Sequence, residues 1–211
     1  MNKTEREEKM RARLAEMQRF ENELRGRGVM CIAGVDEVGR GPLAGPVCAA
    51  CVMLPNDFHV LGVDDSKKLS EKKREALYEE ITGVALAWGI GLVDHRRIDE
   101  INILNATKEA MLAAIEEANS SLRIDHLLID AVSLPEANIP YTAIIKGDAQ
   151  SVSIAAASIV AKVTRDRMMI SFDKVYPGYF FAQNKGYGTK AHYEGISKLG
   201  LTPIHRRTFV D

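Results

Sequence analysis

Four acids of this chain stand at the ends of apolar segments. Asp36 and Glu37 follow VMCIAGV, HLLID ends at Asp130, and YTAIIKGD ends at Asp148. Burying an unpaired carboxylate costs far more free energy than a hydrophobic contact returns, so acids at these places need a chemical reason. Strand ends are favoured places for sites in open α/β sheets, because loops meet there. The pattern therefore predicts that the four carboxylates converge at the end of a sheet.

Carboxylates without a neighbouring His or Cys form a hard, oxygen-only ligand set, which suits Mg²⁺ or Mn²⁺ rather than zinc. Two such ions held about 4 Å apart are a common device for cleaving phosphodiesters. The alternative is that each Asp only ends a strand or begins a turn. For one acid the two interpretations are equally good, whereas the recurrence of the pattern favours a metal site.

The loop after the first two acids has few side chains. Gly39 and Gly41 would let a polymer backbone approach the peptide groups closely, and Arg40 between them offers a fork of donors to a phosphate. A Gly-x-Gly sequence alone is equally compatible with an ordinary tight turn. The loop has no G-K-[ST] sequence, which excludes a nucleotide-binding P-loop.

The composition is that of a soluble globular protein without an overall basic field. Of 211 residues, 46% are hydrophobic, enough for a core of ordinary size. Because the net charge is −1, nucleic-acid binding has to rest on a local cluster of cations. No apolar run approaches the roughly 20 residues that span a bilayer, and the charged N-terminus is unlike a secretory signal. The sequence therefore predicts a cytoplasmic protein with no membrane contact.

The cysteines and histidines do not form a zinc-binding pattern. Cys48 and Cys51 make a C-x-x-C, but the chain has no second pair, and residues three apart on a strand point to opposite faces. The five histidines are scattered without H-E-x-x-H spacing. Three cysteines, an odd number, also disfavour a disulfide framework.

The hydrophobic pattern predicts one α/β domain at 29–211 behind a helical prefix at 1–28. The prefix has a helical apolar stripe, and it either docks on the domain, which is the commoner case, or binds a partner. Strands are predicted at 29–36, 45–54, 84–93, 126–130 and 141–148, and helices at 70–82, 98–119, 151–173 and near the C-terminus. Three sequential strands followed by strand–helix alternation predict a mixed sheet.

Six blocks of the sequence resemble the signature motifs of ribonuclease HII. They are DEVGRGPLAGP (36–46), DDSKKLS (64–70), LLIDA (127–131), KGDAQSVSIAAASIVAKVTRDR (146–167), KGYGT (185–189) and HRRTF (205–209). The blocks occur in family order, and the ordered set is far more specific than any one block. The resemblance implies a ribonuclease-H-like fold, a five-stranded mixed sheet flanked by helices. It also implies an endonuclease that cuts RNA within RNA–DNA hybrids and on the 5′ side of single ribonucleotides in duplex DNA.

The resemblance also implies roles for individual residues. The residues that match the family's metal-binding catalytic acids, which hold two cations, are Asp36, Glu37, Asp130 and Asp148. The loop that contacts the ribose 2′-hydroxyl is matched by Gly39, Arg40 and Gly41. Tyr187 matches the aromatic residue that stacks on the sugar next to the cut, and Lys67 matches a basic residue near the cleaved strand. The implied products carry a 3′-hydroxyl and a 5′-phosphate.

Several cations are candidates for the phosphate contacts that a near-neutral chain otherwise lacks. They are Lys67, Lys68, Lys72, Lys73, Arg74, Lys185, Lys190, Arg206 and Arg207. For the run 67–74 the solvated start of a helix is an equally good interpretation, and only Lys67 is supported by a motif.

Three other functions are compatible with parts of this pattern. Ribonuclease HIII shares the acids but usually has a large N-terminal binding domain, which a prefix of 28 residues does not supply. A catalytically silent nucleic-acid-binding module would keep the fold, but its unused carboxylates would repel one another and a phosphate backbone. A metal-dependent phosphatase for small molecules would use the same acids. A monomer is the default expectation, and the sequence does not decide the role of the prefix or recruitment by a replication clamp.

Overall fold

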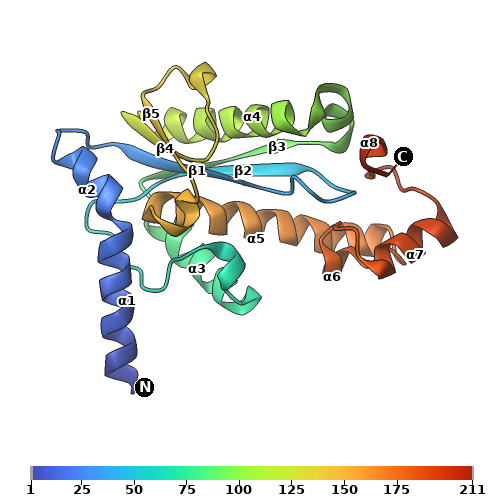
Figure 1. The fold of residues 1–211 in the computed structure, drawn as a ribbon, viewed down its shortest axis with the longest axis horizontal. Helices are drawn as coiled ribbons and strands as arrows, with labels where there is room; N and C mark the ends of the chain where they lie inside the picture. Colours follow the sequence, from blue (N-terminus) through green and yellow to red (C-terminus); the bar gives the residue numbers. More distant parts are fainter. Residues whose placement is uncertain (1, 211) are drawn as a thin grey trace.

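A five-stranded mixed sheet lies at the centre of the computed structural model, which describes residues 2–210 (Figure 1). The strands are β1 (Ile32–Val38), β2 (Val47–Met53), β3 (Ala87–Val93), β4 (His126–Asp130) and β5 (Tyr141–Ile144). Their order across the sheet is β3-β2-β1-β4-β5. β2 runs antiparallel to both β1 and β3, whereas β1, β4 and β5 are parallel. The predicted five-stranded mixed sheet is confirmed.

Helices cover both faces of the sheet. They are α1 (Lys3–Met17), α2 (Arg19–Arg25), α3 (Glu71–Val84), α4 (His95–Ser121), α5 (Val152–Val175), α6 (Phe181–Asn184), α7 (Lys190–Leu199) and α8 (Arg207–Val210). Short 3₁₀ turns lie at η1 (Ser66–Lys68), η2 (Pro135–Ala137) and η3 (Gly147–Ala149). Figure 1 shows α4 on one face of the sheet and α5 with α3 on the other. Within residues 2–210, no helix combines the length and apolarity needed to cross a membrane.

Helix α5 packs very closely on the sheet because both surfaces carry small residues. Ala155, Ala156 and Ala157 are fully buried along the helix. On the strand side, a Cβ added to Gly34 would lie 2.0 Å from the backbone of Ser153, so only glycine permits this approach. The start of α5 is thereby held against the middle of β1, next to the acids that follow Gly34 in that strand.

The prefix consists of two helices that dock on the domain, rather than the one helix that the sequence predicts. Leu14 and Met17 of α1 are buried in the hydrophobic cluster beneath α5 and α3. The helix breaks at Gln18, where the side chain donates a hydrogen bond to the carbonyl oxygen of Phe58 at 2.9 Å. The chain then continues as α2, which carries the buried carboxylate of Glu21.

The last predicted strand is shorter than expected. β5 ends at Ile144 rather than at residue 148, and its middle residues are exposed, because it forms the edge of the sheet. Lys146 then adopts a left-handed conformation (φ 55°) that turns the chain into η3. Asp148 therefore lies in a 3₁₀ turn and not at the end of a strand. Asp36 and Glu37 also differ from the prediction, since they lie within β1, opposite Ala50 and Ala49 of β2.

Candidate active site

The structure brings the four predicted acids together from three segments. β1 and β4 are parallel neighbours, and their register pairs Val35 with Ile129, so Asp36 and Asp130 follow at adjacent positions. Glu37 is next in β1. The turn η3 is tied to the end of β4, because the backbone N–H of Gly147 donates a hydrogen bond to Oδ1 of Asp130 at 2.6 Å. That bond places Asp148 beside Asp130.

Burial and mutual repulsion act on these carboxyls together. The side chain of Asp36 is 4% exposed, and burial, with the neighbouring charges of Glu37 and Asp130, raises its pKa well above the ordinary value. Burial also raises the pKa of Glu37, although Arg40 acts in the opposite direction. The pKa of Asp130 is raised by burial and by Asp148, against a hydrogen bond from Gly147. A cation placed among these groups would relieve both causes.

The donor set fits a hard divalent cation. Oε2 of Glu37 is buried and has no hydrogen-bond partner within residues 2–210, which is an unfavourable state for a carboxylate oxygen unless a cation satisfies it. As the side chains lie, however, no three described acids, histidines or cysteines form a group able to hold an ion. Glu37 is instead paired with Arg40 at 3.3 Å, and Asp148 with Lys67 at 3.5 Å. An incoming cation would have to draw these carboxylates together.

A pocket of about 550 Å³ opens beside two of the four acids, Asp130 and Asp148. It is lined by Asp65, Lys67, Lys68, Asp130, Ala131, Ile145, Lys146, Asp148 and Ala149. Carboxylates and ammonium groups in one pocket suit a ligand set that contains both a metal ion and a phosphate. The sequence prediction missed Lys146, because its place in this pocket depends on where β5 ends.

The glycines of the predicted loop have different roles. Gly39 is buried with φ 93°, and a Cβ there would lie 2.2 Å from Nε of Arg165, so this glycine is required by the protein interior. The glycine at this position is therefore explained by the protein interior, and a contact between Gly39 and a polymer stays a prediction. Arg40 and Gly41 are exposed, and a Cβ on Gly41 would lie 3.6 Å from the ring of Tyr187. The exposed part of the loop and Tyr187, which is 43% exposed, form one surface.

Two buried arginines hold this loop from behind. Arg206 donates hydrogen bonds to the carbonyl oxygens of Gly39, Arg40 and Gly45. Arg165 donates to those of Ala44, Pro46 and Lys185. Both side chains are fully buried.

The prediction that Arg206 contacts phosphate is wrong, because its guanidinium faces the interior and binds the carbonyls of the loop. Arg74 is also turned inward, where it donates to the carbonyl oxygens of Ser66 and Leu69. Arginine is almost never fully buried. The sequence therefore offered no signal for these positions beyond the glycine-rich loop that they support.

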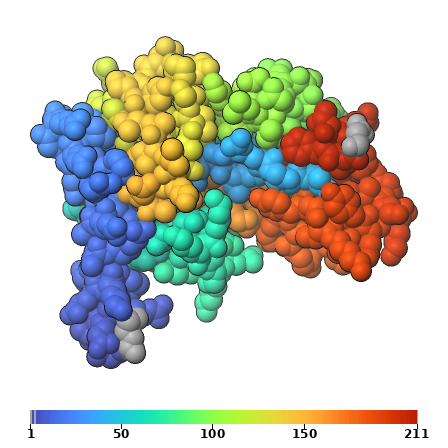
Figure 2. Space-filling model, in the orientation of Figure 1, coloured from blue at the N-terminus to red at the C-terminus, as the bar shows by residue number. Residues whose placement is uncertain are grey.

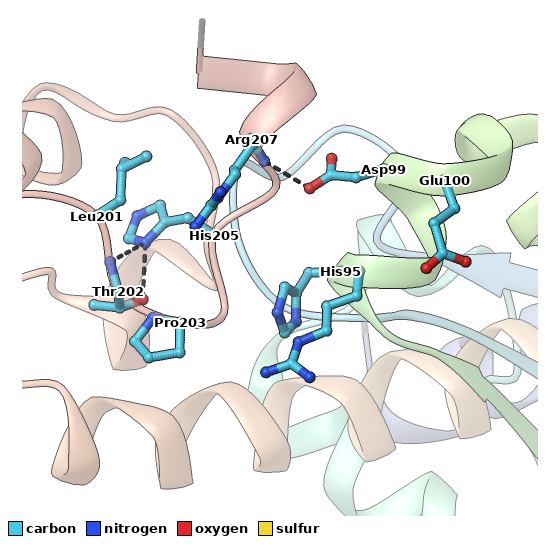
Figure 3. A pocket seen from close by; sticks show the side chains of 9 residues that line it. His95, Asp99, Glu100, Leu201, Thr202, Pro203, His205 and Arg207 are labelled. Carbon is cyan, nitrogen blue, oxygen red and sulfur yellow. Dashed lines mark hydrogen bonds between the residues drawn. The ribbon is translucent and has the colours of Figure 1, made fainter.

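A buried histidine pair holds the backbone of Tyr187. Nδ1 of His192 donates to the carbonyl oxygen of Tyr187 at 2.9 Å, and its Nε2 lies 3.0 Å from Nε2 of His205. Nδ1 of His205 accepts from the backbone N–H of Thr202 at 2.9 Å, the contact visible in Figure 3. His205 therefore carries its proton on Nε2 and donates it to His192. The chain of bonds requires both rings to be neutral.

A second pocket, of about 790 Å³, lies between the start of α4 and the C-terminal segment (Figure 3). None of the four acids lines it. Its wall is fixed where the carboxylate of Asp99 accepts hydrogen bonds from the backbone N–H groups of Arg207 and Thr208. These bonds anchor the segment that carries His205 and Arg206, so this region supports the loop behind the acids.

The ribonuclease HII family model matches residues 33–211. The chain belongs to the ribonuclease HII family. Ribonuclease HII of Listeria innocua is 55% identical over 207 residues, which cover 98% of this chain and 78% of that protein. Ribonuclease HII of Caldanaerobacter subterraneus is 56% identical over 199 residues, covering 94% of this chain and 82% of the relative.

Solved structures of the family have the same fold. The ribonuclease H2 of Pyrococcus horikoshii matches with a TM-score of 0.68 and 27% identity, over 85% of this chain and 93% of that one. The PCNA–ribonuclease HII complex from Archaeoglobus fulgidus matches with a TM-score of 0.69 and 26% identity, over 84% and 94%.

This member of the family is a metal-dependent endoribonuclease that acts on the RNA strand of RNA–DNA hybrids. The predicted ribonuclease-H-like fold and enzyme class are confirmed, which decides against a silent binding module and a small-molecule phosphatase. The family model begins at residue 33, so the prefix lies outside it.

Proposed function

We propose that this enzyme also cuts on the 5′ side of a single ribonucleotide in duplex DNA, using two divalent cations, Mg²⁺ or Mn²⁺. The observation that carries the proposal is that one residue, Arg40, joins two surfaces. Its guanidinium is paired with Glu37 of the acidic cluster, and its backbone belongs to the exposed loop beside Gly41 and Tyr187. A strand whose ribose lies on that loop would have its neighbouring phosphate at the acids.

The proposed ligands of the cations are Asp36, Glu37, Asp130 and Asp148. When bound, two cations supply an activated water for in-line attack and charge for the departing 3′-oxygen. The products are then a 3′-hydroxyl and a 5′-phosphate. The hydroxyl of Ser158, which acts against the rise in the pKa of Asp36, lies 2.8 Å from the hydroxyl of Ser66, the residue before Lys67.

Recognition of the ribose is assigned to the loop and to the tyrosine. Because water is the nucleophile, the 2′-hydroxyl serves as a recognition element, and it is the group by which a protein distinguishes RNA from DNA at one position. Arg40 and Gly41 are exposed where a sugar would lie, and the ring of Tyr187 provides an adjacent face for stacking. Lys67 and Lys146, at the mouth of the acidic pocket, are placed to contact the phosphates of the cleaved strand.

A cleavage assay tests this function. The substrate is an end-labelled DNA duplex with one central ribonucleotide, incubated with Mg²⁺ or Mn²⁺, and the ends are mapped at nucleotide resolution. The expected product leaves the ribonucleotide on the 5′ end of the downstream fragment, and a chelator abolishes the reaction. A matched all-DNA duplex and a full RNA–DNA hybrid serve as controls.

Two results would contradict the proposal. Efficient cutting of the all-DNA duplex would show that the ribose is not read. A requirement for several consecutive ribonucleotides, with normal activity on the full hybrid, would leave the established hybrid activity intact and reject recognition of a single ribonucleotide.

A further inference from the structure

The N-terminal prefix contacts the turn that carries Asp148. Arg13 of α1 donates a hydrogen bond from Nη2 to the carbonyl oxygen of Ala149 at 2.7 Å, and its Nε lies 3.3 Å from a carboxylate oxygen of Asp64. Figure 2 shows the blue N-terminal helices against the gold segment near residue 148. Ala149 follows Asp148 directly, so Arg13 fixes the backbone on the C-terminal side of that acid.

A second contact comes from α2. Oε1 of Glu21 accepts hydrogen bonds from the hydroxyl of Ser151 at 2.6 Å and from the backbone N–H of Ser153 at 3.0 Å. Glu21 is 1% exposed, and Ser151 is the N-cap of α5. An acid at this place satisfies donors that a helix N-terminus otherwise leaves unpaired. It also fixes the residues that follow η3.

Asp148 thus lies in a turn that is held from both sides. On one side the N–H of Gly147 binds Asp130, and on the other side Arg13 and Glu21 hold Ala149 and Ser151. We propose that α1 and α2 position Asp148 for cation binding, with Arg13 and Glu21 as the positioning residues. This inference rests on the proposed role of Asp148 as a metal ligand, and it gives a function to a prefix that lies outside the family model.

The direction of the change in divalent-cation affinity distinguishes a positioning role of Arg13 from a direct electrostatic effect of its charge. Arg13 is a cation near an acidic cluster, so removing its charge would by Coulomb's law strengthen the binding of a divalent cation. Losing the hydrogen bond to Ala149 would instead loosen the turn and weaken binding. Arg13→Lys keeps the charge but loses the planar fork that contacts Asp64 and Ala149 together, and it therefore tests positioning alone.

The experiment measures Mn²⁺ binding by calorimetry without substrate, the Mn²⁺ concentration for half-maximal cleavage, and the melting temperature. Arg13→Ala and Arg13→Lys are compared with Arg11→Ala, which removes an exposed arginine of the same helix whose ion pair in the described part of the chain is with Glu7. Contacts to the groups that orient metal ligands typically change metal affinity roughly 10–100-fold. Because Arg13 acts through the turn, we expect about tenfold weaker Mn²⁺ binding in both Arg13 variants and no change in Arg11→Ala.

Glu21 provides an independent test. Glu21→Gln keeps an oxygen at Oε1 that accepts from Ser151 and Ser153, so it should bind Mn²⁺ like the wild type. Glu21→Ala removes both bonds and should weaken Mn²⁺ binding together with a lower melting temperature.

Asp148→Asn distinguishes the two proposals. If Asp148→Asn binds Mn²⁺ normally, Asp148 is not a ligand and that part of the proposed function fails. If Asp148→Asn weakens binding while both Arg13 variants bind as tightly as the wild type or more tightly, the positioning role alone is overturned. A lower melting temperature in Arg13→Lys with unchanged Mn²⁺ affinity would likewise show that the prefix only adds stability.

Discussion

The acidic cluster and the loop behind it differ in how their buried charges are compensated. Asp36 and Glu37 are close to like charges, and burial and repulsion raise the pKa of Asp36, while Oε2 of Glu37 has no partner in the described chain. Arg165 and Arg206 are buried as deeply, yet each donates to three carbonyl oxygens of the loop region.

The burial and repulsion of the carboxylates are only partly compensated, whereas the hydrogen bonds of the two arginines are already satisfied. Burial and repulsion leave the carboxylates in an unfavourable state, and a divalent cation bound as proposed would relieve it. The arginines, by contrast, are already bound to the backbone, and they rigidify the residues that present Arg40 and Gly41. Preorganised donors cost no reorganisation when a substrate arrives.

Asp36→Asn should have the largest effect. Loss of this proposed ligand should lower cleavage by on the order of a hundredfold or more, beyond the roughly 10–100-fold typical of residues that only contact ligands. Metal-free Asp36→Asn should unfold at a higher temperature than the wild type near pH 8. There the raised pKa means that the ionised carboxylate destabilises the fold. The exposed Asp57→Asn serves as the control, and near-normal turnover of Asp36→Asn at saturating Mg²⁺ would reject its role.

Tyr187→Ala tests the loop side of the comparison. Stacking on a nucleic acid is worth about 1–3 kcal/mol per contact, so cleavage at a single ribonucleotide should fall roughly ten- to a hundredfold. Tyr187→Phe should lose much less if the ring face stacks, and nearly as much if the hydroxyl makes the contact. Mn²⁺ affinity and melting temperature should change little. If Tyr187→Ala melts far lower while its activity per folded molecule is preserved, the residue is structural.

Arg206→Lys tests the support behind the loop. The single ammonium nitrogen of a lysine lacks the planar fork by which Nη1 and Nη2 of Arg206 reach the carbonyls of Gly39, Arg40 and Gly45, and an unpaired buried carbonyl costs about 1–3 kcal/mol. We expect a stability loss of a few kcal/mol and a roughly tenfold higher KM for the single-ribonucleotide substrate, with Mn²⁺ affinity unchanged. Arg207→Lys, at the exposed neighbouring position, is the control. Weaker Mn²⁺ binding in Arg206→Lys would show that the two regions are not separable.

The sequence predicts the acidic side better than its support. The four acids could be found because charged residues interrupt apolar segments at 36, 130 and 148, and a pattern of that kind is local. The position of Asp148 in a 3₁₀ turn could not be predicted, because the edge strand β5 ends early and Lys146 turns the chain. The strand pairing that sets Asp36 beside Asp130 is a long-range property of the parallel register.

The buried arginines escaped prediction for a related reason. Arg206 stands beside the exposed Arg207 in HRRTF, and the two are indistinguishable until the loop at 39–46 has folded over one of them. Arg13 is similarly one of several charged residues in a polar helix, and only the folded turn at Ala149 gives it a partner. Polar groups satisfied by distant backbone leave no periodic signal in a sequence.

The smallest expected effect concerns pH, and it contrasts the two regions directly. Burial, with a further contribution from His192, lowers the pKa of His205 to about 4, and burial lowers that of His192. The unfolded chain, with an ordinary His pKa near 6.5, therefore takes up protons first as the pH falls. Stability from the pair is complete above about pH 6.5 and is lost progressively toward pH 4. The acidic cluster acts in the other direction, because protonation of Asp36 relieves repulsion as the pH falls.

Urea unfolding of the metal-free protein at pH 7.5, 6.0 and 5.0 separates the two responses. His205→Gln keeps an N–H that can donate to His192, but glutamine does not titrate. The acidic cluster contributes equally to the wild type and to this variant, so its contribution drops out of the difference between their unfolding free energies. That difference should shrink as the pH falls, because the wild type alone loses the contribution of His205. Asp36→Asn should remove part of the gain in unfolding free energy that the acidic cluster gives as the pH falls. The loss that comes from the histidines should stay intact, since the two sites do not share a partner. If the wild type and His205→Gln instead change in parallel, protonation of His205 does not contribute to the loss of stability at low pH.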